Sequence, residues 1–394
     1  MERIGIYGGT FNPPHLGHFR GAEYALEQLQ LDRLLMIPTH TAPHKENSQE
    51  IPTPQQRLEM VQLGLGDRED VVASDLEISR GGISYTFETV EQLAAQYPNA
   101  ELFLIIGTDM FSSFESWREP ERILKHATLA VLCRGEKGEQ EQIAETMPRL
   151  TAMGAKVEIL QNPITAISST DLRRMIAFRC ASEFLPQPVE EYILQNGLYD
   201  SWKNYRHLPI EKLQEVVVSL LKPNRVAHVL GCRETAVELA RLYGADETDA
   251  ARAALLHDIT KALGGQLQLT MCRSYGTMLD KFSQKNPKTL HALTGSLVAE
   301  RIFGENEAVV DAIRCHTTGK ADMNLLEKII YVADYVEPNR DFPGVEELRN
   351  LAYTDITKAL KLGLQNTLNL LHRQGSEISP ESMEALFFLE YTGV

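Results

Sequence analysis

The hydrophobic pattern of the chain changes once, near residue 200, which predicts two parts with different folds. Before it, short apolar runs alternate with stretches of helical periodicity, which predicts a parallel sheet covered by helices on both faces. The apolar runs are residues 4–7, 33–38, 102–106 and 129–132. The expected helices are residues 21–29, 54–65, 86–96 and 120–126.

After residue 206 the strand signals stop, and glycines and prolines separate stretches with a spacing near 3.6, which predicts an all-α part. Its expected helices are residues 213–221, 226–243, 248–259, 291–303, 307–315 and 324–335. With 394 residues, the chain is longer than one core usually fills. We predict two domains, residues 1–203 and 206–394. Residues 134–142, rich in Gly, Glu and Lys, are expected to form an exposed loop.

Composition excludes several classes of partner. A net charge of -15 argues against a nucleic-acid partner, because binding to a phosphate backbone needs a basic face. Five scattered cysteines without CxxC spacing are typical of reduced thiols. The sequence has neither the basic and apolar pattern of a signal peptide nor a run of about 18 apolar residues. We expect a cytoplasmic protein with small-molecule substrates and no membrane partner; a homo-oligomer stays open.

Residues 8–18, Gly-Gly-Thr-Phe-Asn-Pro-Pro-His-Leu-Gly-His, directly follow the first expected strand. Gly8 and Gly9 would allow positive φ and close approach of the backbone to a phosphate. His15 and His18 are three residues apart and would share one helix face, with Gly17 leaving room for a ligand. A helix N-terminus with two imidazoles predicts a phosphate site.

A second motif, Ile-Ser-Ser-Thr-Asp-Leu-Arg, occupies residues 167–173. Its Ser and Thr residues can cap a helix whose first turn presents N–H groups and Arg173 to an anion. If both helix N-termini meet at the carboxyl edge of one parallel sheet, they would clamp a triphosphate.

Together the two motifs resemble the HxGH and ISSTxxR motifs of the nucleotidyltransferase superfamily, and the first 200 residues resemble bacterial nicotinate mononucleotide adenylyltransferases. Three further segments are similar to that family: residues 43–45 (Pro-His-Lys), residues 84–86 (Ser-Tyr-Thr), and residues 106–109 (Ile-Gly-Thr-Asp) with Trp117 downstream. The resemblance implies a Rossmann-like α/β domain that joins ATP and nicotinate mononucleotide, giving deamido-NAD and pyrophosphate.

The resemblance also implies the site residues. The substrate phosphate itself would attack the α-phosphorus of ATP, so the protein aligns the reactants and stabilises charge, with Mg²⁺ held mainly by substrate oxygens. The implied catalytic residues are His18, His15, Lys45 and Arg173. His18 would stabilise the leaving pyrophosphate, Lys45 would help neutralise phosphates, and Arg173 with Ser169 would bind the β and γ phosphates. The implied ATP-binding residues are Gly8, Gly9, Thr10, Phe11, His15, His18, Ser168, Ser169, Thr170 and Arg173. The implied nicotinate mononucleotide-binding residues are Lys45, Thr86, Asp109 and Trp117.

The all-α part concentrates histidines and aspartates in apolar helical surroundings. An aspartate such as Asp334, flanked by apolar and aromatic residues, is costly to bury unless a positive charge pairs with it. Imidazoles together with carboxylates suit iron, manganese or zinc far better than Ca²⁺. The set consists of His228, His257, Asp258, His291, His316 and Asp334.

The order of this set resembles the HD-domain metal-dependent phosphohydrolases over residues 206–394. Residues 256–261, 316–319 and 333–340 resemble the bacterial subfamily found beside nicotinate mononucleotide adenylyltransferases, which is associated with symmetrical hydrolysis of diadenosine tetraphosphate to two ADP. By resemblance His228, His257, Asp258 and Asp334 would bind iron or another transition metal ion, and Asp258 would also orient the attacking water.

The same resemblance implies the polyphosphate-facing residues, which are Lys261, His291, His316, Thr317 and Arg340. His291 and His316 could instead ligate a second metal ion. Ala292 departs from the subfamily, whose members carry glycine there, and would loosen the local phosphate geometry.

Three alternatives stay open. The transferase acceptor could be another phosphate ester, such as phosphopantetheine or a flavin nucleotide. The second half could hydrolyse guanosine polyphosphates, deoxynucleotides or cyclic dinucleotides, because HD enzymes share one metal core. It could also be a nucleotide-sensing module that regulates the transferase.

Overall fold

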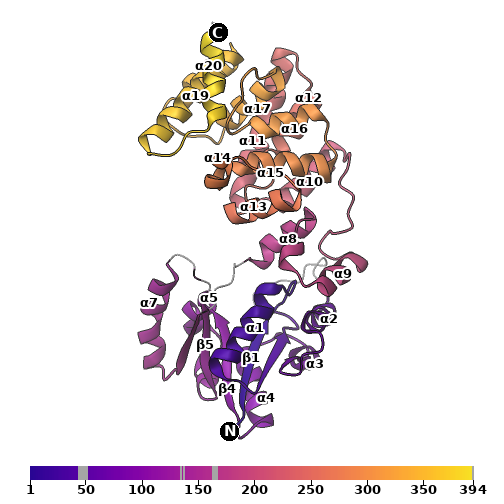
Figure 1. Cartoon of the computed structure of the whole chain (residues 1–394), viewed down its shortest axis with the longest axis vertical. Coiled ribbons are helices and arrows are strands. Elements are labelled where there is room, and N and C mark those ends of the chain that lie inside the picture. Colours follow the sequence, from indigo (N-terminus) through magenta and orange to yellow (C-terminus); the bar gives the residue numbers. More distant parts are fainter. Residues whose placement is uncertain (43–51, 134, 136–137, 162–166, 393–394) are drawn as a thin grey trace. The chain divides into compact units, whose positions relative to one another are not determined.

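The computed structural model describes residues 1–42, 52–133, 135, 138–161 and 167–392. It divides into two compact units, Met1–Trp202 and Lys203–Val394. Figure 1 shows strands only in the first unit, drawn from indigo to magenta, and helices throughout the second, drawn in pink, orange and yellow. The predicted fold classes, α/β followed by all-α, are confirmed.

The first unit is built on a six-stranded sheet of order β3-β2-β1-β4-β5-β6, in which every neighbouring pair is parallel. The four predicted strands are the inner four, and the two strands that the sequence did not reveal form the edges. The strands are β1 (Arg3–Gly9), β2 (Arg33–Pro38), β3 (Val71–Ala73), β4 (Glu101–Gly107), β5 (Ala127–Cys133) and β6 (Val157–Gln161).

Helices cover both faces of this sheet. Along β2, Leu35 and Ile37 pack on the face covered by α4, while Leu34 and Met36 pack on the face covered by α1. This alternation follows from the two-residue period of a strand. The helices are α1 (Leu16–Leu29), α2 (Pro54–Leu65), α3 (Leu76–Arg80), α4 (Thr86–Gln96), α5 (Thr108–Ser112), α6 (Pro120–Leu124), α7 (Glu139–Ala152), α8 (Ser169–Ala177) and α9 (Gln187–Gln195), with 3₁₀ turns η1 (Phe114–Ser116) and η2 (Ser182–Phe184).

The expected exposed loop at residues 134–142 is partly wrong. Helix α7 begins at Glu139, whose buried carboxylate accepts hydrogen bonds from Thr108 Oγ1 at 2.5 Å and from the backbone N–H of Gly135 at 2.8 Å. A buried carboxylate with two donors fixes the start of the helix, although the local sequence is charged. Residues 134, 136 and 137 lie outside the described residues.

The second unit contains helices and no strand among its described residues. The expected helix at residues 248–259 ends early, at Leu256, so His257 and Asp258 lie in the turn that follows α12. The elements are α10 (Ile210–Leu220), α11 (Pro223–Tyr243), α12 (Glu247–Leu256), α13 (Gly265–Ser274), α14 (Lys281–Lys285), η3 (Pro287–Thr289), α15 (Leu290–Val298), the π-helical η4 (Ala299–Phe303), α16 (Glu307–Cys315), α17 (Leu325–Val336), α18 (Val345–Ala352), α19 (Ile356–Arg373) and α20 (Pro380–Tyr391).

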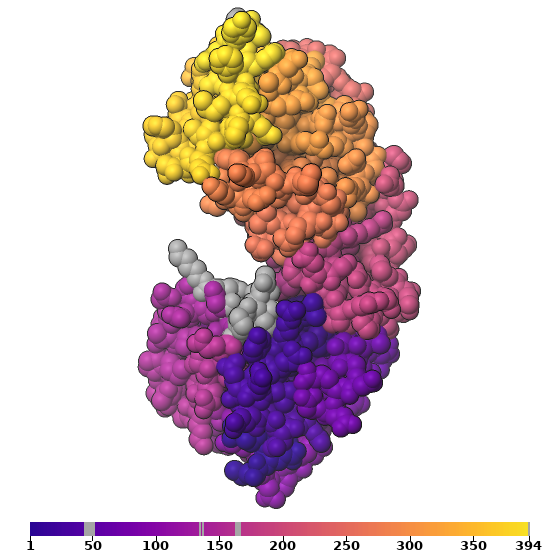
Figure 2. All heavy atoms as spheres, in the orientation of Figure 1, coloured from indigo at the N-terminus to yellow at the C-terminus, as the bar shows by residue number. Residues whose placement is uncertain are grey.

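The last helix fixes a turn that belongs to the candidate site. Ser382 Oγ on α20 donates to the carbonyl of Thr318 at 2.7 Å, and Thr318 Oγ1 donates to Glu381 at 2.7 Å. Figure 2 shows the yellow C-terminal residues packed against orange segments of the same unit. Helix α20 therefore holds the Thr317–Thr318 turn in place. Among the described helices we find none with the length and apolar character of a bilayer span.

Two candidate active sites

The loop between β1 and α1 does not have the positive φ angles that we expected at its glycines. Neither Gly8 nor Gly9 has positive φ; the left-handed residue is Phe11, with φ of 44°. The expectation of positive φ at the glycines is therefore wrong. A Cβ at Gly8 would meet nothing within 4 Å, so its exposed backbone is open to a ligand.

His15 caps α1 and orients His18. The backbone N–H of His15 donates to His18 Nδ1 at 3.2 Å, and the two ring centroids are 3.7 Å apart. Because Nδ1 accepts, the neutral ring carries its proton on Nε2, which can donate to a phosphate oxygen. A Cβ at Gly17 would lie 2.9 Å from two atoms of the His15 ring. Gly17 therefore makes room for the His15 ring, and our expectation that it makes room for a ligand is wrong.

Arg173 brings the two transferase motifs together. Its Nη1 donates to the carbonyl of Asn12 at 2.9 Å, and its Nη2 donates to Thr170 Oγ1 at 3.0 Å. Ser168 caps α8 by accepting from the backbone N–H of Asp171 at 3.0 Å, which leaves Ser169 and Thr170 in the first helical turn. The start of α8 thus lies against the β1–α1 loop, and burial lowers the pKa of the Arg173 guanidinium.

Two residues that were not predicted from the sequence, Arg57 and Tyr199, form hydrogen bonds to this loop. Arg57, which is buried, donates to the carbonyls of Thr10 at 2.7 Å, Thr39 at 2.6 Å and His40 at 3.0 Å. Tyr199 Oη donates to Asn12 Oδ1 at 2.6 Å. A lone arginine in the predicted helix 54–65 and a tyrosine after a helix-ending glycine were the available signals.

Replacing Tyr199 by phenylalanine is expected to weaken the use of ATP that the resemblance implies, while leaving the second unit unaffected. Asn12 is buried, and a buried acceptor that loses its donor costs about 1–3 kcal/mol. We expect the kcat/KM for ATP to fall about tenfold, which corresponds to about 1.4 kcal/mol. Tyr192→Phe, whose hydroxyl donates to Glu59, is the matched control. Wild-type kcat/KM in Tyr199→Phe would show that this hydrogen bond does not position the loop.

The residues expected around nicotinate mononucleotide come from neighbouring segments. Thr86 opens α4, and the preceding Tyr85 ring lies under the Arg118 guanidinium, 4.5 Å from its centroid. Trp117, next to Arg118, packs on Phe114 with ring centroids 5.1 Å apart. Asp109 is exposed in the first turn of α5, directly after β4. Lys45 lies outside the described residues.

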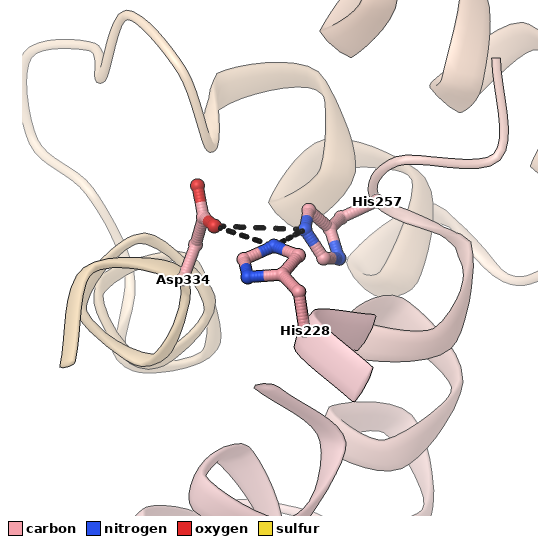
Figure 3. A group of neighbouring side chains, drawn as sticks. All are labelled: His228, His257 and Asp334. Atoms are coloured by element: carbon pink, nitrogen blue, oxygen red, sulfur yellow. Dashed lines mark hydrogen bonds and ion pairs between the residues drawn. The ribbon is translucent and has the colours of Figure 1, made fainter. Parts of the chain in front are cut away.

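In the second unit, His228 from α11, His257 from the turn after α12, and Asp334 from α17 point toward one another (Figure 3). His228 Nε2 lies 3.0 Å from Asp334 Oδ1 and 3.3 Å from His257 Nε2. His257 Nε2 is 3.7 Å from Asp334 Oδ1. Three potential ligand atoms from three separate segments therefore converge.

Asp258 extends this cluster toward two more histidines. Its Oδ2 lies 3.5 Å from His257 Nε2 and 3.7 Å from His228 Nε2. Its Oδ1 lies 3.5 Å from His291 Nε2 and 3.8 Å from His316 Nε2. His257, Asp258 and His316 form a second group that could hold a metal ion, so Asp258 stands between two sets of imidazoles.

Backbone carbonyls orient three of the four rings in the same way. Nδ1 of His257, His291 and His316 each contacts the carbonyl three residues earlier, at 2.7, 3.0 and 2.6 Å. The carbonyl can only accept, so Nδ1 carries the proton and the Nε2 lone pair faces the cluster. Burial lowers the pKa of His257 and of His316 to about 4 each, which keeps both rings neutral at neutral pH.

The two aspartates supply the negative charge. Burial by itself would raise the pKa of Asp334, but the adjacent His228 and His257 rings and the Arg340 guanidinium outweigh it and hold this pKa well below the usual range. Asp258 is 1% exposed, and among the described residues neither of its oxygens accepts a hydrogen bond, although Arg225 forms an ion pair with Oδ2. Neutral imidazoles beside such carboxylates fit a divalent transition metal ion.

Cationic and hydroxyl groups surround the cluster. Lys261 Nζ lies 2.7 Å from His291 Nε2 and 3.6 Å from Asp258 Oδ1, and burial lowers its pKa to about 8. Arg340 Nη2 lies 2.5 Å from Asp334 Oδ1, and Thr317 Oγ1 lies 2.9 Å from His291 Nε2. The structure brings every residue expected in this site together and adds Arg225. Ala292 is buried in α15.

Two family models match the chain. Residues 6–175 match the cytidylyltransferase-like family, and residues 225–339 match the HD domain. The two matches fall within the two structural units, one match in each.

Relatives of each half are known. The "Probable nicotinate-nucleotide adenylyltransferase" of Desulfatibacillum aliphaticivorans is 38% identical over 217 residues, which cover 50% of this chain and 99% of that protein. The symmetrical bis(5'-nucleosyl)-tetraphosphatase of Halalkalibacterium halodurans is 41% identical over 178 residues, covering 44% of this chain and 92% of that protein. A crystal structure of a predicted HD superfamily hydrolase involved in NAD metabolism, from Clostridium acetobutylicum, is 38% identical, covers 47% of this chain and 98% of that chain, and has a TM-score of 0.46.

Proposed function

Because the first half of the chain belongs to the nicotinate-nucleotide adenylyltransferase family and the second half to the HD family that includes symmetrical bis(5'-nucleosyl)-tetraphosphatases, we propose that one polypeptide carries both activities. The first unit would transfer the adenylyl group of ATP to nicotinate mononucleotide. The second would hydrolyse diadenosine tetraphosphate to two ADP.

The bond between Arg173 and the Asn12 carbonyl is the observation that carries the transferase proposal, because it joins both phosphate-binding motifs in one site. The phosphate of nicotinate mononucleotide would attack the α-phosphorus of ATP, and the bond to the leaving pyrophosphate would break. His18 Nε2, the α1 and α8 N-termini and Arg173 would stabilise that leaving group. Thr86, Asp109 and Trp117 would hold the pyridine side, and Lys45 would neutralise phosphate charge. Mg²⁺ bound to substrate oxygens would supply further charge neutralisation.

Competing acceptors test this proposal. The full-length protein is given ATP and Mg²⁺ with nicotinate mononucleotide, phosphopantetheine or flavin mononucleotide, and pyrophosphate release is measured. We expect the highest kcat/KM with nicotinate mononucleotide. An equal or higher value with either of the others would assign a different acceptor.

The convergence of four Nε2 atoms on Asp258 and Asp334 carries the hydrolase proposal. His228, His257, Asp258 and Asp334 would hold iron or another transition metal ion, and His291 and His316 could instead ligate a second ion. Such an ion lowers the pKa of water and polarises phosphoryl oxygens. Asp258 would orient the attacking water, while Lys261, Thr317, Arg340 and Arg225 would hold the polyphosphate and stabilise the departing ADP.

A substrate screen separates this proposal from its alternatives. The full chain, with its metal content measured, is incubated with diadenosine tetraphosphate, guanosine tetraphosphate, dATP or cyclic di-AMP. We expect ADP as the sole product from diadenosine tetraphosphate and the highest kcat/KM for it. Preferred turnover of another nucleotide would reassign the substrate. No hydrolysis, together with altered transferase kinetics in His257→Ala, would instead favour a sensing module.

A further inference from the structure

We propose that Glu337 is the positioning residue for His228 and thereby sets the affinity and geometry of the metal site, an inference that rests on the proposed function of the second unit. Glu337 is the C-cap residue that directly follows α17 and is 1% exposed. Its Oε1 lies 3.0 Å from His228 Nδ1. The residue stands 109 positions from His228 in the sequence, so only the fold brings the two together.

The partners of Glu337 define the tautomer of His228. Its other oxygen, Oε2, accepts from the backbone N–H of Asn339 at 2.7 Å and from Asn339 Nδ2 at 2.9 Å. With two donors on Oε2, the side chain is arranged as an acceptor, and His228 Nδ1 must supply the proton of the third hydrogen bond. His228 Nε2 then presents its lone pair toward Asp334 Oδ1 and His257 Nε2.

His228 differs in this respect from the other three histidines. His257, His291 and His316 are oriented by carbonyls of their own chain segment, three residues earlier. Only His228 among these four is held by a carboxylate. A carboxylate acceptor holds a ring more strongly than a carbonyl and increases electron donation from its other nitrogen to a metal.

Helix α11 is shaped to admit this carboxylate. A Cβ at Gly231 would lie 2.5 Å from Glu337 Oε2 and 3.0 Å from Asn339 Nδ2. Glycine is unfavourable in a helix interior, and Gly231 lies one turn after His228 in the 21-residue α11. Its missing side chain is therefore explained by the approach of Glu337. The segment that supplies one ligand, Asp334, also supplies the group that orients its neighbour.

Cobalt binding by the full-length protein tests the inference. After removal of bound metal, wild type, Glu337→Gln, Glu337→Ala and Gly231→Ala are titrated with Co²⁺, and the visible d–d bands are recorded. Loss of a partner that orients a metal-bound histidine typically lowers metal affinity 10–100-fold. We expect Glu337→Ala to bind Co²⁺ about 10–100-fold more weakly than wild type, with shifted d–d bands, and Gly231→Ala to show a similar loss of affinity. Glu337→Gln has one acceptor oxygen for the three donors of His228 and Asn339, so it should lose affinity, but less than Glu337→Ala, because the oxygen can still accept from Nδ1.

Glu305→Gln is the control, because Glu305 is a buried partner of Arg252 in the same unit; it should bind Co²⁺ as wild type does. If Glu337→Ala does not fold, Gly231→Ala carries the comparison. Wild-type affinity and spectrum in both variants would overturn the inference while leaving the metal site standing. A wild-type chain that binds no Co²⁺ would overturn the proposed site and this inference with it.

Discussion

Replacing Asp334 by asparagine is expected to lower nucleotide hydrolysis at least about a thousandfold and to leave adenylyl transfer unchanged. Asparagine matches the size of aspartate, but its amide lacks the charge that the low pKa of Asp334 secures at neutral pH. Metal-assisted charge stabilisation supplies several kcal/mol, and about 1.4 kcal/mol corresponds to tenfold in rate. Metal content and the rate of ADP release from diadenosine tetraphosphate measure the effect.

The control for this variant is Asp311→Asn, which changes a partly exposed carboxylate on α16 that lies 4.0 Å from Arg314. It should keep wild-type metal content and both activities. If Asp334→Asn hydrolyses diadenosine tetraphosphate within tenfold of the wild-type rate, Asp334 is not a metal ligand. A parallel loss of adenylyl transfer would indicate that the substitution disturbs more than one site.

Replacing His18 by alanine is expected to lower the kcat of adenylyl transfer about 100- to 1000-fold, the usual effect of removing one preorganised donor at a developing charge. The contact of His18 Nδ1 with the His15 N–H assigns the proton to Nε2, so alanine removes a directed donor. Hydrolysis of diadenosine tetraphosphate should stay at the wild-type rate. Release of pyrophosphate under saturating ATP and nicotinate mononucleotide is the measurement.

His126→Ala is the matched control for His18→Ala, since His126 is exposed in the same unit, after α6. It should transfer adenylyl groups as wild type does. If His18→Ala raises the KM for ATP but keeps kcat, His18 binds ATP equally in the ground and transition states. That outcome would contradict its role in stabilising the leaving pyrophosphate.

The sequence predicted the parts of the fold whose hydrophobic period is strong. The four inner strands, buried on both faces, stand out as apolar runs. The two edge strands, β3 and β6, were not predicted, because they are short and largely exposed and so form no apolar run. Three of the five residues of β6 are exposed to solvent. The start of α7 was not predicted, because the local sequence is charged and the helix start depends on a buried hydrogen bond between Glu139 and Thr108.

The candidate sites were predictable as residue types but not as geometry. The histidines and aspartates of the second unit were identified because such residues are unusual in apolar helices. Arg225, Tyr199 and Glu337 were not assigned roles, since each acts through a partner distant in the sequence. The functions first assigned to Gly8, Gly9 and Gly17 rested on general properties of glycine, whereas the structure places Gly17 beside the His15 ring.

The central claim, that one chain holds a site with its own metal and a site whose metal arrives with the substrate, is tested most directly by metal removal. The full-length protein is treated with a chelator, desalted, and assayed for both activities with Mg²⁺ as the sole added metal, then again after addition of Fe²⁺. We predict that adenylyl transfer stays at the wild-type rate throughout, while hydrolysis of diadenosine tetraphosphate is lost and returns with Fe²⁺. Two results would contradict the account: hydrolysis that persists after metal removal, or adenylyl transfer that falls after metal removal and recovers when Fe²⁺ is added.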